Sequence, residues 1–306
     1  MLMIGDDVDR QRTVVQHAIE RGINWFDTAA TYGSGESERN LGRVLAERCV
    51  GSEIHVASKV RLTSDDHRDI RGAVRRSLEA SLNRLGLPRL TLLQLHNSIT
   101  RERNDEPTSV TPADVLSKGG ISDAMEQLCD EGLVLHIGIT GLGAPASLIE
   151  VIRSDRFACI QTPYHLLNPS AGRDVATTLD DANFGNIISA CARAGMGVLA
   201  IRVLAGGALA QNPPSPHTLK TPFFPLALYE RDLERARRLQ QAIGSARRLP
   251  EEAVRFALAH PHIDSALIGF AEIGQIDDAI QAMNSDTPPL EWQDVLNAES
   301  RASPLS

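Results

Sequence analysis

The chain has 306 residues, 42% of them hydrophobic and 23% charged, with a formal net charge of −8 at pH 7. This length and balance suit a soluble globular protein, and we expect one domain over residues 1–306. The negative charge, without a long stripe of Lys and Arg, argues against nucleic acid or an anionic membrane as a partner.

Targeting and metal signals are missing from the sequence. No apolar run reaches the roughly 20 residues that span a bilayer. No N-terminal stretch has the pattern of a secretory leader, so we expect a cytoplasmic protein. The four cysteines are scattered, with no CxxC pair and no histidine at ligand spacing, and we therefore expect no metal site.

Short apolar runs alternate with longer amphipathic stretches along the chain. The predicted strands are Asn24–Thr28, Ile54–Lys59, Leu90–His96, Leu135–Thr140, Cys159–Tyr164, Val198–Leu204 and Ser265–Phe270. The predicted helices are Asp9–Arg21, Ser37–Arg48, Ile70–Leu85, Gly120–Glu131, Pro145–Ser154, Phe184–Ala194 and Pro250–His260. Almost every predicted strand is continuously apolar, which is typical of parallel strands buried on both faces.

Strict alternation fits either a doubly wound sheet or a (β/α)8 TIM barrel. A doubly wound nucleotide-binding sheet needs a glycine-rich turn after its first strand, whereas Asp27 and Thr28 stand there, so the barrel is favoured. Only seven strands are predicted, with Leu2–Ile4 as a possible remnant. We therefore expect an α/β barrel that lacks the N-terminal hairpin and first strand. The long segments Asn97–Gly119 and Ala205–Arg231 leave carboxyl ends of strands and are expected to wall a pocket.

Polar residues stand where three predicted strands end. Asp27, Lys59 and His96 end the first three strands, and Tyr32 follows in the turn after Asp27. The carboxyl ends of barrel strands converge on one mouth, so we expect these four side chains to meet. A phenol normally titrates near about 10. An adjacent ammonium favours the phenolate, and a carboxylate keeps that ammonium charged. The four residues therefore predict proton transfer by Tyr32, with His96 orienting a substrate oxygen.

The order and spacing of these residues resemble the signature of the aldo-keto reductases. The matching motifs are FDTAATYG at 26–33, SE at 37–38, LG at 41–42, ASK at 57–59 and LQLHN at 93–97. The resemblance covers the chain from about Asp9 and implies hydride transfer between a nicotinamide and a carbonyl or alcohol carbon. It implies that Tyr32 is the general acid/base, that Lys59 and Asp27 tune it, and that His96 orients the substrate.

The same resemblance implies a set of cofactor-binding residues. Thr140 and Gln161 match positions that hold the nicotinamide carboxamide, and the segment with Arg202 and Leu204 matches the one after the seventh barrel strand. The segment after the last strand resembles the adenosine-phosphate region and contains Gly269, Phe270, Gln275 and Asp278.

Charge in the adenosine-phosphate region points to the preferred cofactor. Residues 267–283 contain no Lys or Arg and include Glu272, which repels a 2′-phosphate and can accept a bond from a ribose hydroxyl. We therefore expect NAD to be preferred, with NADP possible if a basic residue arrives from elsewhere.

The motif TGL at 140–142 resembles the sugar-oxidising branch typified by L-galactose dehydrogenase and D-threo-aldose 1-dehydrogenase, which implies an aldose as the small-molecule substrate. Two alternatives stay open: a reductase of another aldehyde or a pyridoxal-like compound, and a non-catalytic cofactor-binding protein with an incomplete barrel. The charged predicted helix 231–241 favours a monomer or a weak oligomer.

Overall fold

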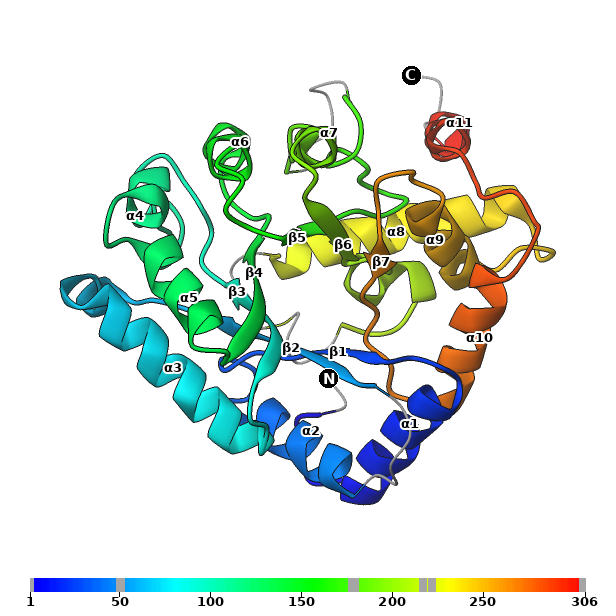
Figure 1. The fold of residues 1–306 in the computed structure, drawn as a ribbon. Helices are drawn as coiled ribbons and strands as arrows, with labels where there is room; N and C mark the ends of the chain where they lie inside the picture. The colour runs from blue at the N-terminus through cyan, green and yellow to red at the C-terminus, as the bar shows by residue number, and fades with distance from the viewer. Residues whose placement is uncertain (1–2, 48–52, 176–181, 215–218, 220–223, 303–306) are drawn as a thin grey trace.

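Seven parallel strands form one curved sheet in the order of the chain (Figure 1). The computed structural model describes residues 3–47, 53–175, 182–214, 219 and 224–302. The strands are β1 (Trp25–Asp27), β2 (His55–Val60), β3 (Leu90–Leu95), β4 (Val134–Thr140), β5 (Cys159–Pro163), β6 (Gly197–Ile201) and β7 (Ser265–Ala266). This arrangement is that of a (β/α)8 barrel with one strand fewer among the described residues, as the sequence predicted.

Helices follow the strands and lie outside the sheet (Figure 1). They are α1 (Val8–Glu20), α2 (Glu36–Ala46), α3 (Ile70–Leu85), α4 (Pro112–Leu116), α5 (Ile121–Asp130), α6 (Pro145–Ile152), α7 (Ile187–Arg193), α8 (Leu226–Ile243), α9 (Leu249–Leu258), α10 (Ile273–Met283) and α11 (Trp292–Ala302). Two short 3-10 helices, η1 (Ser64–Arg68) and η2 (Ala205–Ala210), lie in connections.

Local signals in the sequence set the helix ends. In α3, the Asp69 side chain accepts a hydrogen bond from the backbone N–H of Gly72, which caps the amino end. Gly86 ends the helix with a left-handed φ of 65°, a conformation that glycine adopts without strain. The prediction Ile70–Leu85 is therefore confirmed at both ends.

The seam between β1 and β7 is covered by helices. Among the described residues, β1 pairs only with β2, and β7 only with β6. Outside these strands, α1 packs against α10 through an apolar cluster that includes Val14, Ala18 and Ile276. His17 and Arg21 each lie 3.0 Å from Asp277 and add polar contacts to the same helix pair. The ring of helices is thus continuous where the ring of strands is not.

Several predicted boundaries are wrong. The helix predicted from Phe184 begins only at Ile187, the helix predicted to reach Ser154 ends at Ile152, and Arg48, the predicted end of the second helix, lies outside the described residues. The remnant strand fails for Met3 and Ile4, which lie in a turn, where the Asn40 side chain binds the carbonyl of Met3; Leu2 lies outside the described residues. The sixth strand was predicted to reach Leu204 but ends at Ile201, because Arg202 adopts a left-handed φ of 56°. The last strand was predicted to reach Phe270 but ends at Ala266, and it pairs only with β6 among the described residues.

The second long connection is shorter than predicted. Helix α8 begins at Leu226, inside the segment 205–231 that we expected to be irregular. Parts of that connection, at 215–218 and 220–223, lie outside the described residues. The first connection, 97–119, is ordered: Asn97 is fully buried, and its side chain binds the backbone of Leu62 and Thr108.

Candidate active site

A buried ion pair joins the first two strands at their carboxyl ends. The Lys59 ammonium donates to Oδ1 of Asp27 and, at 2.8 Å, to the carbonyl oxygen of Thr28. The side chain of Lys59 is 1% exposed and that of Asp27 is 16% exposed. Burial acts to lower the pKa of Lys59, but the carboxylate of Asp27 and the phenol of Tyr32 outweigh it and hold that pKa above its usual value. The ammonium is therefore charged at neutral pH.

Tyr32 reaches this ion pair from a tight turn. Its ring centre lies 4.9 Å from Nζ of Lys59. The turn continues through Gly33, Ser34 and Gly35, with left-handed φ values of 59°, 52° and 83°. A Cβ on Gly33 would meet the side chains of Glu36 and Ile4 at 3.0 to 3.2 Å. Glycine at position 33 therefore permits both the backbone conformation and the close packing that place the phenol.

His96 completes the group of four predicted residues. Its backbone N–H bonds the carbonyl of Val60 at 2.8 Å, directly beyond the end of β3. Its ring meets the Tyr32 ring edge-on, with centres 5.7 Å apart. The hydroxyl of Thr31 lies 3.3 Å from Nδ1 of His96. The structure thus brings together the acid, the ammonium, the imidazole and the phenol that the sequence predicted to meet.

Several residues of the sequence signature support the site from behind, through contacts between α2 and the elements next to it. The hydroxyl of Thr28 donates to Ser37 at 2.9 Å. Glu38 is fully buried and accepts hydrogen bonds from Ser58 at 2.5 Å and from Arg84 at 2.6 Å. These contacts attach α2 to the residue that follows β1, to β2 and to α3. The sequence motif marked Ser37 and Glu38, but only the structure assigns them this supporting role.

The two residues predicted to hold a carboxamide are neighbours. Thr140 and Gln161 are register partners on β4 and β5, and they are 3% and 2% exposed. The hydroxyl of Thr140 is buried and has no hydrogen-bond partner among the described residues. Gln161 donates from Nε2 to Oδ2 of Asp27 at 2.5 Å. An orphaned buried hydroxyl beside a side-chain amide suits a polar ligand group such as a carboxamide.

Arg202 and Leu204 follow β6 at the same end of the barrel. The guanidinium carbon of Arg202 lies 3.7 Å from the ring centre of Phe224, within cation–π range. Burial lowers the pKa of Arg202 to about 10, against the attraction of Asp232. Leu204 is half-buried and directly precedes η2.

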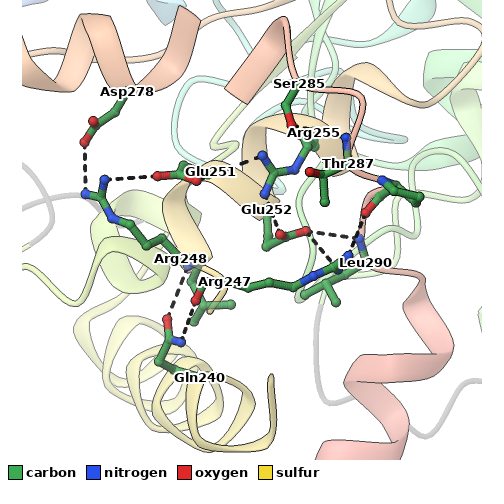
Figure 2. Close-up of polar contacts among 12 residues, drawn as sticks. Gln240, Arg247, Arg248, Glu251, Glu252, Arg255, Asp278, Ser285, Thr287 and Leu290 are labelled. Carbon is green, nitrogen blue, oxygen red and sulfur yellow. Dashed lines mark hydrogen bonds and ion pairs between the residues drawn. The ribbon is translucent and has the colours of Figure 1, made fainter. Parts of the chain in front are cut away.

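The segment after β7 is held by its own cap and by arginines from elsewhere. The side-chain oxygen of Gln275 accepts from the backbone N–H of Ala271 at 2.7 Å. Asp278 accepts from Arg248 at 2.9 Å, and Figure 2 shows Arg248 between Asp278 and Glu251. Phe270 packs against the cluster between α1 and α10, and a Cβ on Gly269 would meet open space.

Basic residues do reach this segment. Arg10, on α1, donates to the carbonyl of Ala271 at 3.0 Å and lies 3.3 Å from Glu272. The sequence left NADP possible if a basic residue arrived from elsewhere, and the structure places Arg10 beside Glu272 and Arg248 beside Asp278. No sequence window around 267–283 could show this, since both arginines come from other elements.

The described residues contain neither a cluster of metal ligands nor a membrane-spanning helix. No group of three or more His, Cys, Asp or Glu side chains is placed to bind a metal ion. None of the helices in the described ranges is long and apolar enough to cross a bilayer.

Comparisons with known proteins agree on one family. A sequence profile described as the Aldo/keto reductase family matches residues 6–298. L-galactose dehydrogenase of Arabidopsis thaliana is 27% identical over 273 residues, which are 88% of this chain and 76% of that protein. D-threo-aldose 1-dehydrogenase of a Pseudomonas species is 27% identical over 327 residues, 97% of this chain and 89% of that protein.

A solved structure resembles the fold. An aldo-keto reductase of Bacillus halodurans in its holo form matches with a TM-score of 0.70 and 21% identity, covering 99% of this chain and 90% of that one. This similarity concerns the fold alone.

Proposed function

The chain belongs to the aldo/keto reductase family, and from this premise we propose that it oxidises aldoses with NAD, using Tyr32 as the general acid/base. Membership of the family makes it an NAD(P)-dependent oxidoreductase that acts on small carbonyl or alcohol substrates. The observation that carries the finer proposal is the placement of the Lys59 ammonium 4.9 Å from the centre of the Tyr32 ring.

Each of the four clustered residues has a part in the proposed reaction. A bound nicotinamide would supply the hydride acceptor, since no side chain can do so. The Tyr32 oxygen takes the proton from the substrate hydroxyl. Lys59 places its ammonium beside the Tyr32 phenol, where it can stabilise negative charge that develops on the phenol oxygen, and Asp27 keeps Lys59 charged and in place. His96 donates a hydrogen bond to the substrate oxygen and so orients it.

The cofactor proposal assigns the remaining predicted residues. Thr140 and Gln161 would hold the carboxamide, and the orphaned hydroxyl of Thr140 supports this assignment. Arg202 and the backbone around Leu204 would face the phosphates, since a guanidinium is a strong phosphate donor. The segment with Gly269, Phe270, Gln275 and Asp278 would hold the adenosine.

A preference for NAD over NADP rests on Glu272. Its carboxylate is more than half exposed, and its pair with Arg10 spans 3.3 Å at the surface, where such pairs contribute little. A 2′-phosphate at this point would have to compete with Glu272 for Arg10. A ribose hydroxyl, by contrast, could donate to that carboxylate.

The aldose proposal is supported by relatives whose names identify sugar substrates, L-galactose dehydrogenase and D-threo-aldose 1-dehydrogenase. The test is the rise in absorbance of reduced nicotinamide when the protein is mixed with NAD or NADP and a panel of aldoses, aldehydes and alcohols. We expect turnover with NAD and at least one aldose. Replacing Tyr32→Phe should abolish that turnover and leave dinucleotide binding in place. Equal turnover by this variant would remove Tyr32 from the reaction.

A further inference from the structure

The turn that follows Tyr32 has a conformation that its own residues do not favour. Gly33, Ser34 and Gly35 all have left-handed φ values, of 59°, 52° and 83°. Ser34 carries a Cβ, which is strained in the left-handed region. Within the turn, the backbone N–H of Glu36 donates to the carbonyl of Gly33 at 3.0 Å. A strained turn persists where the surrounding structure holds it, so contacts from outside the turn help to decide where the phenol lies.

A short segment before α1 packs against this turn. Residues 3–5, which we call the strap, lie in a turn of their own. A Cβ on Gly33 would come within 3.2 Å of Cγ1 of Ile4, so the Ile4 side chain lies directly against the Gly33 backbone. The backbone N–H of Gly5 donates at 2.8 Å to Oε1 of Glu36, the first residue of α2. The strap therefore contacts both the turn and the residue at which α2 begins.

Two buried side-chain amides hold the strap in place. Nδ2 of Asn40, on α2, donates to the carbonyls of Met3 at 3.1 Å and Gly5 at 3.3 Å. Nε2 of Gln11, on α1, donates to the carbonyl of Gly5 at 2.7 Å. Asn40 is 5% exposed and Gln11 is 1% exposed, so removing either donor would take a hydrogen bond from a shielded part of the structure. The strap is thus fixed to the helices that precede and follow the Tyr32 turn in the chain.

We propose that the strap positions Tyr32, by holding the turn after it in the conformation that keeps the phenol beside the Lys59 ammonium. Asn40 is the main positioning residue, because one amide group binds both ends of the strap. The kinetic part of this inference rests on the proposed function, in which Tyr32 is the general acid/base. The structural part, in which the strap holds the turn, does not depend on that function.

The variant Asn40→Asp detaches the strap with little change of shape. A carboxylate still accepts the hydrogen bond from Arg43, but it cannot donate to the two strap carbonyls. Gln240→Glu is the matched control, because the Gln240 amide donates to the carbonyls of Gly244 and Arg247 in the connection between α8 and α9 (Figure 2). Both variants therefore lose an amide donor that binds two backbone carbonyls of a connecting segment.

Hydrogen–deuterium exchange tests the structural part without any turnover. Amides of the turn, such as that of Glu36, are protected while the turn is closed. We expect them to exchange about 10-fold faster in Asn40→Asp, because the turn loses contacts that keep it closed, and at the wild-type rate in Gln240→Glu.

Steady-state kinetics test the kinetic part. With saturating NAD and the aldose that the wild type oxidises, we expect kcat to fall about 10–100-fold in Asn40→Asp, because a displaced phenol transfers the proton less well. KM should change by less than about 3-fold, and the dinucleotide affinity should stay at the wild-type value, which also shows that the barrel is folded. Ile4→Ala, which keeps every strap hydrogen bond and removes the packing on Gly33, should lower kcat by about 3–10-fold.

The outcomes separate this inference from the proposed function. Wild-type exchange rates in Asn40→Asp would overturn the inference and leave the proposed function intact. Faster exchange with an unchanged kcat would also overturn it, because the strap would then hold the turn without positioning the phenol. Absence of turnover in the wild type would overturn the proposed function, and the exchange rates would still decide whether the strap holds the turn.

Discussion

The ammonium nitrogen of Lys59 lies 4.9 Å from the centre of the Tyr32 ring, and Asp27 and the carbonyl of Thr28 take two of its hydrogen bonds. The strand β2 sets the position of Lys59, and the left-handed turn after Tyr32 sets the position of the phenol. The ammonium and the phenol are therefore held close together by two elements of the fold.

Replacing Lys59→Met removes the charge and keeps a side chain of similar length. We expect turnover to fall by about 10²–10⁴-fold, because the phenolate loses its ammonium neighbour. The protein should also lose stability, since Asp27 is left shielded and unpaired. Steady-state kinetics and a urea titration measure the two effects. Lys59→Arg keeps the charge in a planar group, so full activity in Lys59→Arg would show that position matters less than charge.

Replacing Asp27→Asn should shift the pH profile of turnover. In the wild type, Asp27 and Tyr32 outweigh burial and raise the pKa of Lys59. A raised pKa means that the pair stabilises the fold fully below the ordinary lysine value and loses that contribution as pH rises through the raised value. Without the carboxylate, burial dominates and the pKa of Lys59 falls. We therefore expect the alkaline limb of turnover to move to lower pH. If the alkaline limb of the variant stays at the wild-type pH, Asp27 does not control the charge of Lys59.

The strand ends were predictable because each carries a polar residue after an apolar run. Asp27, Lys59 and His96 stand at the ends of β1, β2 and β3, and parallel strands place such ends together whatever the side chains between them. Helix α3 was predictable at both ends, since Asp69 caps it and Gly86 ends it. These signals involve residues close together in the sequence, so they act in the same way whatever the rest of the fold is.

Individual side-chain pairs between elements far apart in the sequence were not predictable. The bond from Gln161 to Asp27 joins residues 134 positions apart, and the pair of Arg10 and Glu272 joins residues 262 positions apart. No residue near these four in the sequence indicates which partner each of them binds. The last strand was predicted as Ser265–Phe270, but its short length was not, because strand length depends on pairing with neighbouring strands and β7 pairs only with β6 among the described residues.

Replacing Gly42→Ala tests why the signature contains a glycine in α2. A Cβ at this position would overlap the backbone carbonyl of Leu85, the last residue of α3. Backbone cannot rotate away as a side chain can, so we expect a loss of about 1–3 kcal/mol in the free energy of unfolding. Chemical denaturation measures it. Arg39→Ala, at an exposed position of α2, is the control and should change stability by less than about 0.5 kcal/mol. An unaltered stability in Gly42→Ala would show that α2 and α3 can move apart.

Replacing Asp114→Asn tests what orders the connection 97–119. Thr111 caps α4, and the carboxylate of Asp114 completes the capping box by accepting from the backbone N–H and the hydroxyl of Thr111. Arg103 forms a two-pronged pair with the same carboxylate. Burial alone would raise the pKa of Asp114, but Arg103 and Thr111 lower it to about 2. A lowered pKa stabilises the fold above the ordinary carboxyl value, and this contribution disappears as pH falls toward about 2.

The difference between wild type and Asp114→Asn should therefore depend on pH. We expect it to be about 1–2 kcal/mol at neutral pH, after allowance for solvent around the half-exposed Arg103, and to vanish near pH 2. Asp65→Asn, whose carboxylate is 90% exposed, is the control and should show no such dependence. A difference that persists at acid pH would mean that the amide of the variant disturbs the loop for steric reasons. If the connection walls the substrate pocket, the same variant should raise KM at neutral pH more than it lowers kcat.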